Sequence, residues 1–163
     1  MRIKSVYSFL FGVAILLSGC GVLETSNRSE DPFPPPIPTG TVEMNNTQHG
    51  MKSGGYEWIQ TNDDGDSQAV QTDAPSPMQI ADIMEAIALK PETEAEITFN
   101  SEHKPQLTLY IWNEDGRNTE GSLKDHSFTL PEKTGEYVYE VVADWSYENV
   151  KGTVSYTFLT EVE

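Results

Sequence analysis

The sequence predicts a mainly β domain, an antiparallel β-sandwich with one short helix, behind a disordered proline-rich tether and a signal peptide. Aromatic and β-branched residues recur in short runs that turn-forming residues separate, which is typical of a sandwich or barrel. Only one stretch of the chain has helical periodicity. The domain is predicted over residues 51–163, about 113 residues, which is enough for one hydrophobic core and too few for two domains.

The expected strands are six segments rich in aromatic and β-branched residues. Glycine-containing turn sequences lie between several of them, such as those ending at Gly65, Gly116 and Gly135. In the fifth segment aromatic and small apolar residues alternate with a second set that includes Glu140, so one face should point to the core. The expected strands are 56–60, 95–100, 106–113, 126–130, 136–145 and 153–162.

The segment 76–87 predicts the helix. Ser76 is placed to cap its first turn and Pro77 occupies the first helical position, where a missing N–H costs nothing. Four apolar residues follow at helical spacing and should share one face that packs over an end or edge of the sandwich, with a partner-docking face as the alternative. They are Ile80, Ile83, Met84 and Ile87.

The first 20 residues have the three parts of an export signal. Arg2 and Lys4 form a positive start, and an apolar run over 6–17 is too short to span a membrane. The run ends in Leu17-Ser18-Gly19-Cys20, which resembles the lipobox of bacterial lipoproteins. The resemblance implies cleavage after residue 19, diacylglycerol and palmitate on Cys20, and an anchor on the extracytoplasmic face of the cell membrane. Two acyl chains suffice for stable anchoring.

Residues 20–50 are expected to form the lipidated tether. Prolines dominate residues 32–38, which favours extended polyproline geometry and is incompatible with an interior strand. Few apolar residues flank them, so little surface is available to bury. A spacer is the favoured interpretation, and a proline-rich ligand for another domain is the alternative.

The entry to the fifth strand carries the clearest indication of a fold family. Gly135 is followed two residues later by Tyr137, at the point where a new strand begins. This arrangement resembles the tyrosine corner of immunoglobulin-like sandwiches, although the paired cysteines of antibody domains are absent. The resemblance implies that Trp112, on an earlier strand, is the core tryptophan. The set of short motifs around Tyr56, Leu130 and Tyr139 also resembles uncharacterised lipoproteins of Gram-positive spore formers, which implies no activity.

Charge and cysteine content exclude several classes of function. The formal net charge is −16, and loss of residues 1–19 with their two basic residues makes it −18. Such an acidic protein repels nucleic acid, so nucleic-acid binding is excluded. Cys20 is the only cysteine, which excludes an intramolecular disulfide and argues against a thiol enzyme or a thiolate metal site.

The candidate metal sites are few. His49, His103 and His126 have no partner at metal-ligand spacing. An acidic turn containing Asn62, Asp64 and Asp66 suggests a loop for calcium, which prefers several oxygen ligands. Against the EF-hand template, the first and last liganding positions would both be glutamine, so that pattern fails. A looser calcium loop and a solvated hairpin turn stay open as alternatives.

The remaining features favour binding over catalysis. No nucleophile elbow or phosphate-binding glycine loop is present, and carboxylate pairs are expected by chance among 26 acidic residues. Aromatic residues outnumber what one core needs, and Tyr147, expected in a surface turn, is the candidate contact to a ligand. The sequence therefore predicts a non-catalytic module that binds an envelope protein or wall ligand. A small hydrolase with a carboxylate pair on its loops, and a structural or cation-binding surface protein, are the alternatives.

Overall fold

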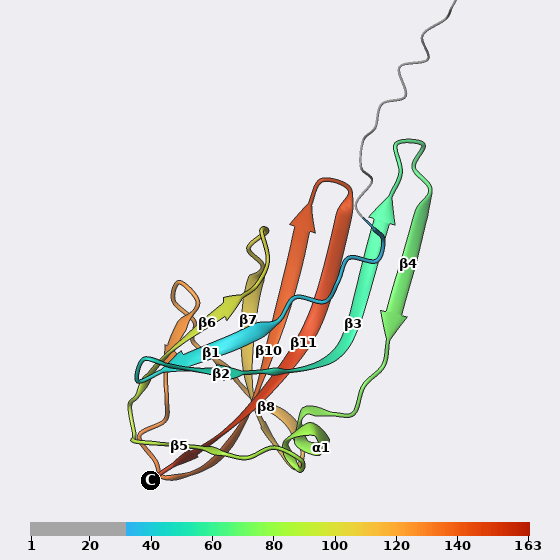
Figure 1. The fold of residues 1–163 in the computed structure, drawn as a ribbon. Helices are drawn as coiled ribbons and strands as arrows, with labels where there is room; N and C mark the ends of the chain where they lie inside the picture. The colour runs from blue at the N-terminus through green and yellow to red at the C-terminus, as the bar shows by residue number, and fades with distance from the viewer. Residues whose placement is uncertain (1–31) are drawn as a thin grey trace, which may run out of the picture. The chain divides into compact units, whose positions relative to one another are not determined.

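The computed structural model of the protein describes residues 32–163. The predicted signal peptide, the lipobox with Cys20 and the first part of the tether lie outside this range. The described residues form a mainly β domain with two antiparallel sheets and one short helix, as the sequence predicted (Figure 1).

The smaller sheet has four strands in the order β2-β1-β6-β9, and all its pairs are antiparallel. Its strands are short, which places polar loops close to both ends. The bounds are β1 Gly40–Met44, β2 Thr47–Gly50, β6 Glu94–Phe99 and β9 Ser127–Thr129.

The larger sheet has seven strands and contains the long hairpin of β10 and β11 at its centre. Six of them follow the order β4-β3-β11-β10-β7-β8, and β5 adds to β11 in parallel. The bounds are β3 Lys52–Thr61, β4 Ser67–Thr72, β5 Ile87–Leu89, β7 Gln106–Asn113, β8 Gly116–Gly121, β10 Gly135–Tyr147 and β11 Val150–Val162.

The strand order is that of an immunoglobulin-like sandwich. The neighbours β1-β6-β9 correspond to one sheet of that fold, and β11-β10-β7-β8 correspond to the other. Residues 45–89, between β1 and β6, hold four extra strands and the helix. Two of these strands, β3 and β4, widen the larger sheet beyond β11 and form its outer edge (Figure 1).

The tyrosine corner is present, as predicted. The hydroxyl of Tyr137 donates to the backbone carbonyl of Lys133 at 2.7 Å, and Gly135 opens the strand with a φ of +148°. The prediction of Trp112 as the core tryptophan is wrong. Trp112 lies on the outer face of β7, whereas Trp58 and Trp145 are in the core, 1% and 2% exposed, with ring centroids 5.7 Å apart.

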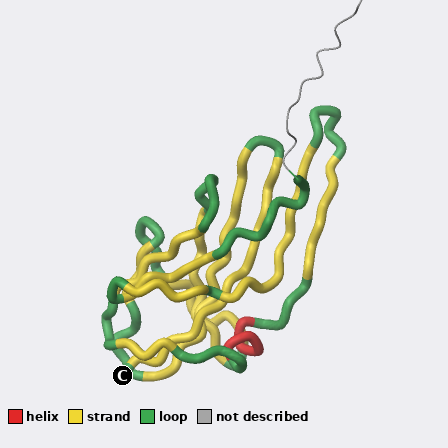
Figure 2. The backbone as a smooth tube through the Cα atoms, in the orientation of Figure 1, coloured by secondary structure: helices red, strands yellow, loops and turns green. Residues whose placement is uncertain are grey.

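The helix begins as predicted but ends early. Helix α1, drawn red in Figure 2, spans Pro77–Ala81. Ser76 and Gln79 form a capping box at its start. Because the helix ends at Ala81, the predicted apolar stripe does not form: Ile83 is 82% exposed and Ile87 belongs to β5. The helix covers one end of the outer face of the larger sheet, where Ala81 packs on Val138 and Leu159.

The folded domain begins earlier than residue 51. Residues 40–50, predicted as tether, form β1 and β2, because Val42 and Met44 alternate with polar residues and fill the core. The preceding proline segment is also attached to the domain, since the hydroxyl of Tyr156 donates to the carbonyl of Pro38 at 2.7 Å. All six predicted strands are present, with their ends shifted by a few residues at most places.

Candidate functional site

The candidate site is a groove on the outer face of the larger sheet. Its volume is about 810 Å³. Strands β3, β7, β8, β10 and β11 form its floor, and the segment between β4 and α1 forms one wall. The charged and polar side chains of its lining include Glu57, Asp73, Trp112, Arg117, Glu140 and Ser155.

Glu140 lies at the centre of the floor. It belongs to the alternate set of β10 that points away from the core, yet it is only 3% exposed. Among the described residues it is the one acidic or basic residue that is buried. A buried carboxylate needs compensating donors, because burial removes its hydration.

Four hydrogen bonds compensate the charge of Glu140. Arg117 donates from Nε to Oε2 at 2.7 Å and from Nη2 to Oε1 at 3.0 Å. The indole of Trp112 donates to Oε2 at 2.7 Å, and the hydroxyl of Ser155 donates to Oε1 at 2.8 Å. Each carboxylate oxygen therefore accepts two bonds, from side chains on β7, β8 and β11. We call these four residues the Glu140 cluster.

The electrostatics of the cluster keep Glu140 ionised. Burial alone would raise its pKa, but the bonds from Arg117, Ser155 and Trp112 outweigh burial and lower the pKa below the usual value. The bond to Glu140 likewise raises the pKa of Arg117, against a smaller opposing effect of burial. The guanidinium also lies over the ring of Tyr110, 4.4 Å from its centroid.

The cluster is a rigid floor and is poorly suited to acid–base chemistry. A general acid or base must exchange a proton with a substrate within hydrogen-bond reach. Both oxygens of Glu140 are already bonded, and the side chain is screened from solvent. Arg117 is 48% exposed and uses Nε and Nη2 for Glu140, which leaves Nη1 to face other acceptors.

The rim of the groove is acidic. Glu57 on β3 and Asp73 after β4 are exposed at its edge. Thr153 and Ser155 add hydroxyl groups along β11, and Thr153 donates to Asp144. Because Arg117 and Glu140 neutralise each other, the rim leaves the groove with a negative charge.

The predicted calcium loop is the turn of the β3–β4 hairpin. Asn62 donates its N–H to Asp66 O at 2.8 Å, Gly65 donates to Asn62 O at 2.9 Å, and the side chains of Asn62, Asp64 and Asp66 are exposed. Within residues 32–163, no three His, Cys, Asp or Glu side chains gather in a way that could hold a metal ion. Calcium binding by this turn stays a prediction.

Tyr147 lies at the end of β10 and not in the turn after it. It is half-buried, and its ring stacks on His103 with centroids 3.9 Å apart. The carbonyl of His103 in turn accepts a bond from the indole of Trp145. One face of the Tyr147 ring is thus covered by His103, and the side chain also packs against the hydrophobic core.

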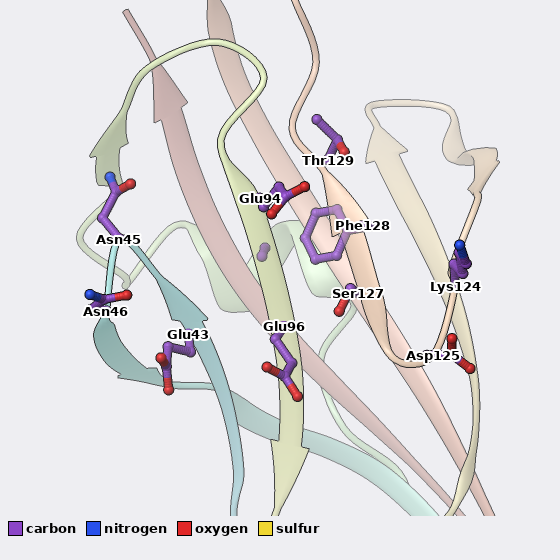
Figure 3. A pocket seen from close by; sticks show the side chains of 11 residues that line it. Glu43, Asn45, Asn46, Glu94, Glu96, Lys124, Asp125, Ser127, Phe128 and Thr129 are labelled. Atoms are coloured by element: carbon purple, nitrogen blue, oxygen red, sulfur yellow. The ribbon is translucent and has the colours of Figure 1, made fainter.

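A second pocket, of about 770 Å³, lies on the outer face of the smaller sheet. Glu43 and Glu96 lie opposite each other on β1 and β6, and Lys124 and Asp125 stand on the far side of β9 (Figure 3). Glu94 adds a further carboxylate. These acidic side chains are partly or fully exposed, unlike the buried carboxylate of Glu140.

Sequence reasoning missed the Glu140 cluster. Its one visible sign is a charged residue inside the apolar run from Val138 to Val142. The partners of Glu140 are 15 to 28 residues away along the chain, and strand register alone brings them together.

Comparison of the chain with protein-family models, with curated proteins and with solved structures gave no match. In the described part of the chain, no helix has the length and apolar character needed to cross a membrane.

Proposed function

We propose that the protein is a lipid-anchored, extracytoplasmic binding module of the cell envelope, and that the groove of the larger sheet binds its partner. The partner is an envelope protein or a wall-associated ligand. The function is non-catalytic, and the anchor is the lipid on Cys20.

The Glu140 cluster is the observation that carries the proposal for binding. The four donors hold the one buried carboxylate of the described residues in a single ionised state. A floor of this kind gives a groove a fixed shape and fixed charges, which lowers the ordering cost of binding. It offers no proton to a substrate.

The lipobox supports the proposal for the anchor. Leu17-Ser18-Gly19-Cys20 follows a positive start and an apolar run in the expected order. Replacing Cys20→Ala should abolish incorporation of labelled fatty acid and leave the precursor uncleaved. Unchanged labelling in this variant would disprove the anchor, whatever the groove binds.

Site-specific photo-crosslinking in the native membrane tests the groove. A photoreactive amino acid at Thr153, exposed on the floor of the groove, should capture a defined partner. The matched control places the same group at Thr129, exposed on β9 beside the second pocket. Capture of a partner from Thr153 and not from Thr129 supports the groove as the binding surface.

Capture from Thr129 alone would move the binding surface to the smaller sheet. The rival function, a small envelope hydrolase, is predicted from the sequence to use a carboxylate pair on the loops. The facing carboxylates that this pocket offers, Glu43 and Glu96, lie instead on strands β1 and β6. Loss of a hydrolytic activity in Glu43→Gln or Glu96→Gln, with the fold retained, would favour that rival.

A further inference from the structure

The two sheets have five edge strands, and four of them are poor templates for another strand. β2 has four residues, and β5 and β9 have three each. β8 has six residues, but glycines stand at both of its ends, its sequence contains Arg117, and its pairing with β7 shifts register. Short length, charge and bulges are the usual protection of sheet edges.

β4 lacks each of these protections. Its six residues, Ser67–Thr72, pair with β3 without a register shift and include no charged residue, proline or glycine. Within residues 32–163, no strand pairs with its other side, and it stands at the margin of the larger sheet (Figure 1). Side-chain bonds hold it in place: Thr61 to Ser67, and Gln68 to Gln60, both at 2.8 Å.

Two backbone hydrogen bonds show which groups of β4 are free to pair. Thr61 donates its N–H to Asn149 O, on the side of β11, and Asn62 donates to Asp66 O across the hairpin. Backbone groups of an antiparallel strand alternate in direction. The register therefore directs the backbone N–H and C=O groups of Gln68, Val70 and Thr72 toward β3. The same groups of Ser67, Ala69 and Gln71 point outward.

The charges at the two ends of β4 indicate the partner. The turn before it contains Asp63, Asp64 and Asp66, and Asp73 follows it directly. A second copy pairing antiparallel with β4 through these outward groups, with Ala69 opposite Ala69, would bring Asp66 of each copy within one residue of Asp73 of the other. This repulsion disfavours a dimer through β4, while basic residues at both ends of an added strand would meet opposite charge.

We propose that β4 binds an extended basic segment of a partner protein by strand addition. The segment is an uncharged β-prone stretch of about six residues with lysine or arginine at both ends. Its backbone pairs with Ser67, Ala69 and Gln71, and its basic ends meet the acidic residues that flank β4. The proposed strand addition shares Asp73 with the rim of the groove. It requires neither the lipid anchor nor a ligand in the groove, so its failure would leave the proposed function standing.

The test uses the full chain in detergent and a synthetic peptide. In the peptide, two lysines flank an alternating threonine–valine hexapeptide at each end, and the control peptide has glutamates in their place. We expect hydrogen exchange to show rapid exchange at Ser67, Ala69 and Gln71 in the free chain and slower exchange with the lysine peptide. Protection of these amides in the free chain, or no binding of the lysine peptide, would overturn the proposal.

Ala69→Pro removes one outward N–H and leaves the pairing with β3 intact, since proline is tolerated where the N–H faces solvent. This variant should bind the lysine peptide roughly ten-fold more weakly than the natural chain does. The control variant Ala69→Thr should bind the peptide with the affinity of the natural chain. Should Ala69→Pro fail to fold, a peptide N-methylated at its central valines makes the same test from the other side.

Three further results would contradict the proposal. The first is equal binding of the lysine and glutamate peptides, which would remove the role of charge. The second is undiminished binding after loss of the outward N–H or after N-methylation. The third is a concentration-dependent dimer that Ala69→Pro dissociates, which would assign the edge to a second copy of the chain.

Discussion

Strand β10 separates two environments that are stabilised in different ways. On its inner face, Tyr139, Val141 and Ala143 are buried among apolar and aromatic side chains from both sheets. On its outer face, Val138 packs under α1, and the next outward residue, Glu140, is buried by a cluster of polar donors. One strand thus has an apolar core on one side and a fixed charge pair on the other.

One strand can therefore hold a buried charge on its outer face without disturbing the apolar core on its inner face. The inner face needs only alternation and volume, so its stability depends on packing. The outer face needs specific partners from three other strands, and these hold a charge that the core could not accommodate. The two faces should therefore respond differently to substitution.

The largest effect is expected on the inner face, at Trp58. Its ring packs against Trp145 and directly on the backbone of Gly152, where an added Cβ would lie 2.0 Å from the ring. Trp58→Ala should lower the free energy of unfolding by about 3–5 kcal/mol because it leaves a large cavity. Chemical denaturation measures it. The exposed control Ile83→Ala should change stability by about 0.5 kcal/mol or less, and similar effects of the two would contradict the packing account.

A smaller effect with a characteristic asymmetry is expected on the outer face. Arg117→Met leaves a buried carboxylate without its cation and should cost about 2 kcal/mol, since partial exposure of Arg117 softens the penalty. Adding Glu140→Leu removes the unpaired buried carboxylate, so the double variant should be more stable than Arg117→Met alone. Denaturation of both variants gives the comparison. A double variant that is the less stable of the two would show that the charge pair is not what stabilises this face.

The tyrosine corner provides a third, weaker effect at the entry of the same strand. Tyr137→Phe removes the bond to the carbonyl of Lys133 and should cost about 0.5–1.5 kcal/mol, the net contribution of one hydrogen bond. Thermal unfolding of the two proteins measures it. An unchanged midpoint would show that this hydroxyl does not stabilise the fold.

The smallest expected effect is the contribution of Glu140, on the outer face, to the pH dependence of the unfolding free energy. The folded pKa of Glu140 lies below its ordinary value of 4.5, so ionised Glu140 stabilises the fold above that value. The contribution should be lost as pH falls through the lowered folded pKa. The difference in unfolding free energy between the natural chain and Glu140→Gln should therefore shrink in acid. A difference that grows in acid would show that folding raises the pKa of Glu140 and does not lower it.

The inner face could be predicted from the sequence, because alternation in β10 and β11 is a local pattern. The sandwich, the tyrosine corner and the cap of α1 follow from such patterns. The short strands β1 and β2 could not be predicted, since prolines precede them and only Val42 and Met44 mark the buried side. The position of Trp112 also depended on strand register, which decides the face that a residue occupies.

The outer groove could not be predicted for a related reason. Glu140, Trp112, Arg117 and Ser155 meet only through the pairing of β10 with β7 and β11, and of β7 with β8. No spacing in the sequence relates them. The acidic turn at Asn62 and the half-buried Tyr147 are local features that a sequence displays, yet both lie outside the lining of the groove.

The most direct test of the central claim, that the groove with its acidic rim is the binding surface, is the yield of capture from Thr153 as salt is varied. Attraction to the rim is screened over about 8 Å at physiological ionic strength, so the yield should fall as salt rises. It should also fall in the double variant Glu57→Gln, Asp73→Asn, and stay unchanged in the matched variant Glu94→Gln, Glu96→Gln on the other sheet. A yield that is indifferent to salt and to the rim variant would contradict the account.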